Sequence, residues 1–233
     1  IGTKENPHTG NVLIKLHGTR NSDAFAYDAS VELGNKFLAN YNIMKMYGMP
    51  RRSKMSRLRD EATKNSNSFT VGTGLDWVPG DRIVLLPTGF VRHMKDDVFI
   101  KTYDNATGVV TIDTTLNHYH WGQADDTGAD FNGIDIRGEV ILLSRNVKIA
   151  GEDVESWGGH IITGDTVELE GAEIKMRAGH LVLDHVEVHN NSQIDTMNSA
   201  IRFENAMSGY SSVTNCTVHN GFGWGINTVN SAN

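Results

Sequence analysis

The chain has 233 residues, a formal net charge of −7, 24 glycines, 4 prolines and one cysteine. The acidic balance argues against a nucleic-acid partner, and no run of ~18 apolar residues is present, so we expect no membrane contact within this segment. A single cysteine excludes an intrachain disulfide framework, and many glycines with few prolines are typical of tight turns.

The first third of the chain mixes strand signals with an ambiguous stretch. Alternating apolar residues predict strands at residues 12–16 and 43–47. Between them, residues 24–39 have apolar spacing compatible with a helix, although Gly34 weakens that interpretation.

Residues 51–64 are rich in arginine and lysine. The segment forms either an anion-binding patch or a solvated loop or strand edge, and the interruption by Asp60 and Glu61 favours the loop or strand edge.

Residues 69–116 read as a small β unit. The turn from Trp77 to Asp81 contains Pro and Gly, and it should reverse the chain into a core strand that includes Ile83. Further strands are expected at 98–103 and 109–112, joined by a hairpin turn.

The loop at residues 117–133 is acidic, with Asp125, Asp126 and Asp130 close together. Calcium prefers such oxygen-rich loops, but the spacing matches no known calcium loop and favours a solvated one.

From residue 134 onward, short strands follow one another with turn breaks. The segment at 186–190 recurs at 216–220, each time ending in Val-His-Asn. Such pieces stack as parallel strands in a solenoid, and Asn at a coil corner tolerates left-handed backbone geometry. In the strand at 201–204, Ile201 and Phe203 should be buried, and Arg202 and Glu204 should face outward.

These residues resemble a known family. The motifs Trp77-Val-Pro-Gly-Asp-Arg-Ile-Val84, Gly138-Glu-Val-Ile-Leu-Leu-Ser-Arg-Asn-Val-Lys-Ile149 and Trp157-Gly-Gly-His160 are similar to the eight-glycine domain and the β-helix that follows it. That pairing occurs in the fibrocystin and fibrocystin-like family and in the related cell-surface hyaluronidase group. The resemblance implies an all-β chain. Residues 1–133 would be the C-terminal part of an eight-glycine-type β domain, and residues 134–233 the start of a right-handed parallel β-helix. We expect the sequence to be an excerpt of a longer chain.

One departure from the family pattern bears on function. The hyaluronan-degrading relatives carry a motif of the form Arg-Tyr-Pro-Ile-His-Phe-His, where this chain has Asn198-Ser-Ala-Ile-Arg-Phe-Glu204. Arginine replaces one histidine and cannot act as a base. The resemblance therefore favours a non-enzymatic extracellular segment of a large fibrocystin-like cell-surface or secreted protein, serving adhesion, coat or surface-filament assembly. The alternative is a carbohydrate-active enzyme or binding module acting on an acidic polysaccharide such as hyaluronan.

Four residues are candidate ligand-binding positions: Trp157, His160, Arg202 and Glu204. Trp157 either stacks on a sugar or caps the β-helix. Arg202 and Glu204 either bind a sugar or form an ion pair on the outer face. We assign no catalytic residue, metal ligand or cofactor, and we expect the partners to be other extracellular proteins, glycans or further copies of the chain.

Three histidines of the solenoid region form a possible ladder: His185, His189 and His219. His189 and His219 occupy equivalent positions of the repeat and should lie on adjacent coils. They form either a metal or anion site with Glu187 or a coil-corner ladder, and the lack of tight ligand spacing favours the ladder.

Three sequons indicate an extracellular glycoprotein, with acceptors Asn105, Asn190 and Asn215. Asn105 lies in the expected hairpin turn and is the best acceptor.

Overall fold

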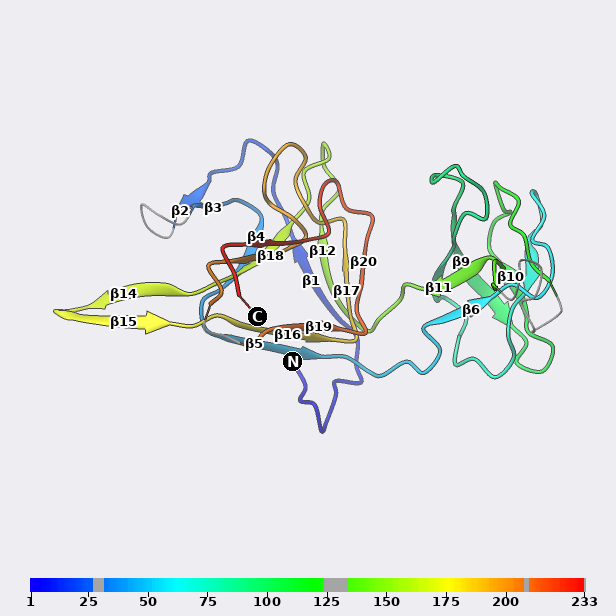
Figure 1. Ribbon diagram of the computed structural model, residues 1–233, viewed down its shortest axis with the longest axis horizontal. Helices are drawn as coiled ribbons and strands as arrows, with labels where there is room; N and C mark the ends of the chain where they lie inside the picture. The colour runs from blue at the N-terminus through cyan, green and yellow to red at the C-terminus, as the bar shows by residue number, and fades with distance from the viewer. Residues whose placement is uncertain (27–31, 124–133, 208–209, 233) are drawn as a thin grey trace. The chain divides into compact units, whose positions relative to one another are not determined.

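The computed structural model describes residues 1–26, 32–123, 134–207 and 210–232 (Figure 1). All regular secondary structure in these ranges is β-strand, which confirms the all-β class. Within these ranges there is no helix long and apolar enough to cross a membrane. The chain divides into two compact units, which are described separately: Ile1–Pro50 with Arg145–Asn233, and Arg51–Ser144.

The first unit is a parallel β-helix whose strands form three sheets (Figure 1). The first sheet contains β1 (Val12–Leu16), β12 (Val147–Gly151), β17 (Val186–His189) and β20 (Thr217–His219). The second sheet contains β4 (Phe37–Asn40), β13 (His160–Thr163), β18 (Ile201–Glu204) and β21 (Ile226–Val229). The third sheet contains β5 (Ile43–Tyr47), β16 (His180–Asp184) and β19 (Ser212–Thr214). The parallel stacking predicted after residue 134 is confirmed for the strands of these three sheets, whereas β11 (Glu139–Leu142) pairs antiparallel in the second unit and β14 (Thr166–Glu170) pairs antiparallel with β15 (Glu173–Arg177).

Period-two alternation builds the core of this unit. Equivalent residues of successive coils stack in register, as in the inward ladder of Ile14, Ile149 and Val188. Ile201 is fully buried, as predicted, whereas Phe203 was expected to be buried and packs only half-buried against the same core. Arg202 and Glu204 alternate with them on the outer face, as predicted.

Asparagines at the coil corners adopt left-handed backbone geometry. Positive φ angles occur at Asn190 (51°), Asn205 (53°), Asn215 (54°), Asn220 (51°) and Asn230 (47°). Asn tolerates this conformation better than most residues because its short polar side chain bonds locally. The role expected of Asn at coil corners is confirmed.

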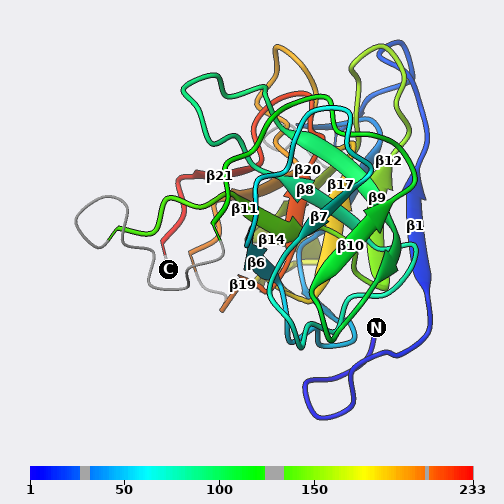
Figure 2. The same cartoon turned by 90° about the vertical axis from the view of Figure 1, so that its right-hand side faces the viewer.

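The second unit is an antiparallel sheet (Figure 2). Its strand order is β6-β11-β8-β9-β10-β7. The strands are β6 (Met55–Arg57), β7 (Ser68–Thr70), β8 (Arg82–Leu85), β9 (Asp96–Tyr103), β10 (Val109–Ile112) and β11 (Glu139–Leu142). The turn before β8 has Gly80 at φ 88°, and Ile83 and Leu85 are fully buried behind it. The predicted reversal into a core strand is confirmed.

Two arginines of the basic segment at residues 51–64 form internal ion pairs. The Arg51 guanidinium lies 2.7 Å from the Asp81 carboxylate, and that of Arg57 lies 2.8 Å from Glu139. Carboxylates thus neutralise two of the six basic side chains of the segment, and its residues 55–57 form β6 at the edge of the sheet, which supports the strand-edge interpretation.

Two expectations differ from the structure. The helix-compatible stretch at 24–39 forms short strands in its described part: β2 (Phe25–Ala26), β3 (Glu32–Gly34) and β4. Pairing of β4 with β13 overrides the local spacing. The boundary expected at residue 133 also does not coincide with the two units, because β1, β4 and β5 pair with β12, β13 and β16 far along the chain. Residues before 51 are therefore the first coil of the β-helix.

Candidate functional site

A surface pocket of about 460 Å³ lies on the β-helix unit. It is bounded by the connection between β1 and β4, by the turn before β13 and by the connection between β17 and β18. Its charged, amide and aromatic lining includes Arg20, Glu32, Asn35, Trp157, Gln193, Asn198 and Arg202. Two of the four predicted ligand-binding residues, Trp157 and Arg202, thus share one pocket.

Trp157 is held firmly in the pocket wall. Its indole Nε1 donates to the Asn35 side-chain oxygen at 2.8 Å, and only 9% of the residue is exposed. The Arg20 guanidinium lies over the ring, 4.8 Å from its centroid. This is a cation–π contact, and it leaves the guanidinium donors of Arg20 at the mouth of the pocket.

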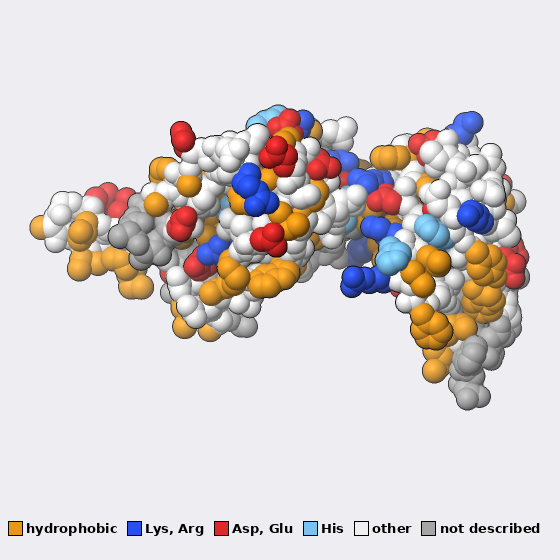
Figure 3. All heavy atoms as spheres, turned by 90° about the horizontal axis from the view of Figure 1, so that it is seen from above, with side chains coloured by type: hydrophobic (Ala, Val, Ile, Leu, Met, Phe, Trp, Pro, Cys, Tyr) orange, Lys and Arg blue, Asp and Glu red, His pale blue; other side chains and the backbone are white. Residues whose placement is uncertain are grey.

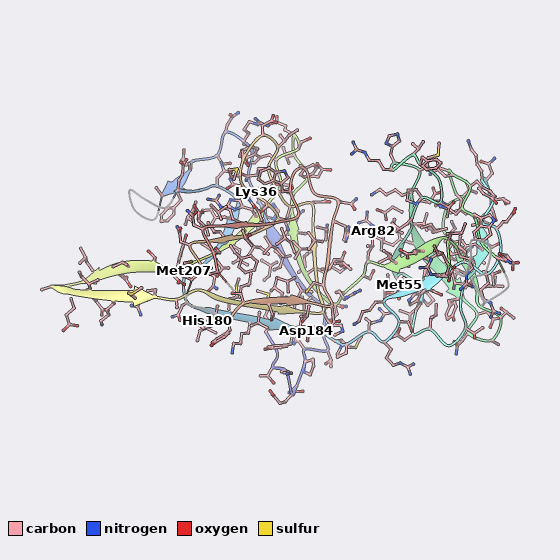
Figure 4. All side chains as sticks on the ribbon, viewed as in Figure 1. Lys36, Met55, Arg82, His180, Asp184 and Met207 are labelled. Carbon is pink, nitrogen blue, oxygen red and sulfur yellow. The ribbon has the colours of Figure 1, made fainter. Side chains whose placement is uncertain are left out.

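Lys36 ties together the loops behind this wall (Figure 4). Its buried ammonium donates to the carbonyl oxygens of Gly18 (3.1 Å), Glu152 (2.6 Å) and Trp157 (2.7 Å). Burial lowers the pKa of the Lys36 amine. Because all three ammonium protons have acceptors, the lysine acts as a structural pin that fixes the position of Trp157.

Arg202 is oriented by a chain of side-chain amides. The Asn198 oxygen accepts from the Arg202 guanidinium at 2.9 Å, and the Asn198 amide donates to Gln193 at 2.7 Å. Gln193 in turn donates to the backbone of Asn35 and of Gly158, at 3.1 Å each. Arg202 also pairs with Glu204, which bears out the outer-face ion pair as one of the two interpretations.

His160 lies behind the pocket and has no exposed surface. Its ring centroid is 6.0 Å from that of Phe37, and neither ring nitrogen makes a hydrogen bond of ordinary geometry. Burial, with the positive charge of Arg202 nearby, lowers the pKa of His160 to about 4. Direct contact between His160 and a ligand, as the sequence suggested, is therefore not available in this structure.

Sequence reasoning missed most of the pocket lining. Arg20, Asn35, Gln193 and Asn198 lie in irregular connections, where no periodicity marks which side chains meet. The amide-rich stretch at residues 190–198, which contains Gln193 and Asn198, is a sequence signal that could have drawn attention to two of them.

The predicted histidine ladder is present for two of its three members. The rings of His189 and His219 stack with centroids 5.5 Å apart and planes 14° apart. His185 points elsewhere and contacts Asp184 at 2.9 Å. Across the described residues no three His, Cys, Asp or Glu side chains are grouped to hold a metal ion. The acidic residues Asp125, Asp126 and Asp130 lie outside the described ranges.

The three sequon asparagines differ in accessibility. Asn105 is exposed in the turn between β9 and β10, whereas Asn190 and Asn215 are half-buried at coil corners. The Asn215 amide also donates to Asp184 at 2.8 Å.

We predict that material secreted from animal cells carries a glycan on Asn105 and little or none on Asn215. A glycosylated asparagine needs its amide free and room for the oligosaccharide, which the hairpin turn provides. Glycopeptide mass spectrometry measures the occupancy of each site. An occupied Asn215 beside a bare Asn105 would contradict the ranking.

Comparison with known proteins places these features in context. Residues 1–59 match the family model of the G8 domain. Human Fibrocystin-L is 23% identical over 235 residues, covering 95% of this chain and 5% of that protein. Mouse Fibrocystin is 29% identical over 161 residues, covering 65% of this chain and 4% of that protein. The Cell surface hyaluronidase of Danio rerio is 31% identical over 121 residues, covering 50% of this chain and 8% of that protein.

The chain thus spans about one twentieth of the length of Fibrocystin-L. Among solved structures, the Gp54 tailspike of Acinetobacter baumannii bacteriophage AP22 matches at a TM-score of 0.31 and 12% identity, covering 90% of this chain and 30% of the tailspike chain. The resemblance expected from the tryptophan-containing motifs is confirmed by the sequence matches.

Proposed function

We propose that this chain, a relative of the fibrocystin-like proteins with a G8 segment at its start, is an extracellular adhesive segment. In this proposal it binds an acidic polysaccharide without cleaving it and belongs to a larger cell-surface or secreted protein. The observation that carries the proposal is the pocket that combines Trp157, two arginines and three side-chain amides. Relatives named for hyaluronan binding or hyaluronidase activity support a saccharide as the ligand class.

The chemistry of the pocket fits a sugar acid. Guanidinium groups bind carboxylates in a bidentate manner, and amides exchange hydrogen bonds with hydroxyl groups. Glu32 is the one carboxylate of the described residues in the lining, against Arg20 and Arg202. Glu204, which lies outside the lining, neutralises Arg202, so Arg20 is the guanidinium expected to bind the carboxylate of the sugar.

A binding experiment tests the proposal. Arg20 is exposed at the pocket, and replacing it by alanine should weaken the binding of hyaluronan oligosaccharides at least tenfold. A hydrogen bond to a charged group contributes about 1.4 kcal/mol or more, and a loss of about 1.4 kcal/mol lowers the affinity tenfold. Isothermal titration calorimetry gives the affinity, and a neutral chitin oligosaccharide of equal length tests the role of the carboxylate.

The matched control is Arg177→Ala, which removes one arginine from an exposed ion pair outside the pocket. Equal affinities of the Arg20→Ala variant and the unmodified chain would refute the pocket as the binding site.

We also predict that the chain leaves high-molecular-mass hyaluronan intact. A glycosidase of the usual kind uses two carboxyl groups that flank the scissile bond. Glu204 is engaged by Arg202, and Glu32 lies alone among the described carboxylates of the pocket. Polymer mass, followed by light scattering with and without calcium, should stay constant. Depolymerisation that disappears in Glu204→Gln would instead support the enzyme alternative.

A further inference from the structure

A second pocket, of about 470 Å³, opens on the outer face of the third sheet of the β-helix unit. Its lining comes from β5, β16 and β19, from Lys4 near the start of the chain and from the residues just before β19. Figure 4 labels His180 and Asp184 on this sheet, which forms the lower side of the unit in that view. The lining shares no residue with the pocket at Trp157.

Strand alternation explains which side chains reach this second pocket. Met46 and Leu183 point into the core, so their neighbours along each strand face outward. Parallel pairing sets the outward residues side by side across the sheet in two rows, Lys45–Val182–Ser212 and Tyr47–Asp184–Thr214. Neighbouring strands lie about 4.8 Å apart, so the ends of each row are about 10 Å apart and can contact one ligand from both sides.

Two polar groups of the lining are oriented as hydrogen-bond donors. The Tyr210 backbone amide donates to His180 Nδ1 at 3.2 Å, which places the proton of the neutral ring on Nε2. The Leu181 backbone amide donates to the Ser211 hydroxyl oxygen at 3.0 Å, and this leaves the hydroxyl proton available to a ligand. His180 and Ser211 therefore need acceptor atoms on the ligand.

The second pocket also carries two ammonium groups that have no carboxylate beside them. Lys4 and Lys45 are exposed, and neither forms an ion pair within the described ranges. Asp184 is the one carboxylate of the described lining, and its Oδ1 already accepts from the Asn215 amide at 2.8 Å and lies 2.9 Å from His185 Nδ1. On the opposite side of the unit, acidic and basic side chains are interspersed (Figure 3). The charge of the pocket thus favours an anion.

The kind of donor distinguishes this pocket from the pocket at Trp157. The Arg20 guanidinium presents parallel N–H groups that match a planar carboxylate. The donors of the second pocket are ammonium, hydroxyl and imidazole groups, each of which reaches a single acceptor from a different strand or segment. A sulfate ester has three terminal oxygens in a tetrahedral arrangement, so it can accept from several such donors at once.

Two tyrosines give the pocket a surface for a sugar ring. Tyr210 is 87% exposed next to His180, and Tyr47 is half-buried on β5. An aromatic ring packs against the apolar C–H face of a sugar, and the phenol hydroxyl can exchange hydrogen bonds with the sugar hydroxyls. An inorganic anion alone would leave these rings uncovered.

We propose that the second pocket binds a sulfated sugar. The sulfate ester accepts from the Lys45 ammonium and from the hydroxyl and imidazole donors, while the sugar ring packs on Tyr210. This binding site uses none of the residues that line the pocket at Trp157, so either site can be tested without the other.

Binding of a chondroitin sulfate hexasaccharide to the Arg20→Ala chain tests the proposal, because that background disables the pocket at Trp157. Isothermal titration calorimetry should show at least tenfold tighter binding than for an unsulfated chondroitin hexasaccharide. Adding Lys45→Gln should weaken the binding of the sulfated sugar at least tenfold, since a hydrogen bond from a charged donor is lost. Lys45 is exposed and glutamine has a similar length, so the strand should persist.

The matched control is Lys15→Gln in the same background. Lys15 is also an exposed lysine on a strand of the first coil, β1, and it lies outside both pockets. This variant should bind as the Arg20→Ala chain does. Absence of binding by the Arg20→Ala chain, equal binding of the two hexasaccharides, or equal affinities of the Lys45→Gln and Lys15→Gln variants would overturn the proposal. Hyaluronan binding by the Lys45→Gln chain with Arg20 intact would still support the function of the pocket at Trp157.

Discussion

Replacing Glu187 by glutamine is expected to lower the free energy of unfolding of the β-helix unit by about 3–5 kcal/mol. Glu187 lies on β17 with 2% of its surface exposed. Its carboxylate accepts from the Arg145 backbone at 2.9 Å, and it lies 2.9 Å from the Lys148 ammonium and 3.3 Å from His219. The pKa of Glu187 falls to about 2 because these hydrogen bonds and charges outweigh the effect of burial.

The loss is large because the substitution removes a buried negative charge that faces the half-buried Lys148 ammonium and the nearly buried His219 ring. The same substitution at Glu168, in an exposed pair with Arg177, should cost less than about 1 kcal/mol. Urea unfolding of the two variants measures both effects. Similar values for Glu187→Gln and Glu168→Gln would show that burial does not strengthen the Glu187 network.

The second large effect is a dependence of stability on pH that comes from His160. Its folded pKa is about 4, below the ordinary value of 6.5, so the unfolded chain binds the proton more tightly. Stability from this group is complete above pH 6.5 and is lost as the pH falls toward 4. The full difference is about 3 kcal/mol, since one pKa unit corresponds to about 1.4 kcal/mol.

Urea unfolding of the unmodified chain and of His160→Phe between pH 4 and 7.5 isolates this contribution. Burial also lowers the pKa of His189, which adds a slope of the same sign, so the difference between the two proteins is the relevant quantity. His189→Phe serves as the second reference. Parallel stability curves for the unmodified chain and His160→Phe would mean that the His160 ring does not lose its proton on folding.

Local patterns predicted the strands well but not their partners. Alternation marked residues 12–16 and 43–47 as strands, yet nothing nearby in the sequence showed that Val12 pairs with Val147 or Ile43 with His180. Parallel pairing across a coil is a long-range relation, and period-two alternation reports only which face is buried. The repeat at 186–190 and 216–220 was readable because both copies lie in consecutive coils.

The candidate site was less predictable than the fold for the same reason. Trp157 and Arg202 were identified from a family motif and from alternation on β18, and they meet in the pocket. The side chains that hold them, Asn35 and Asn198, follow no period because they lie in connections. His160 matched the motif best of all, but its burial depends on Phe37 and other residues of β4, which belong to a different coil.

The position of the second unit within the chain bears on how the β-helix assembles. Residues 51–144 are inserted between β5 and β12, and the two ends of the first unit at this insertion lie together, with the Met49 amide donating to the Asn146 side chain at 2.7 Å. Closing a flexible loop costs entropy that grows with its length, by about 0.6 kcal/mol for each doubling. If the inserted unit folds first, it brings its own ends together and shortens the effective loop between the first two coils. The folded insert then behaves as a short loop, so the rate at which the first coil pairs with the second depends on how fast the insert folds.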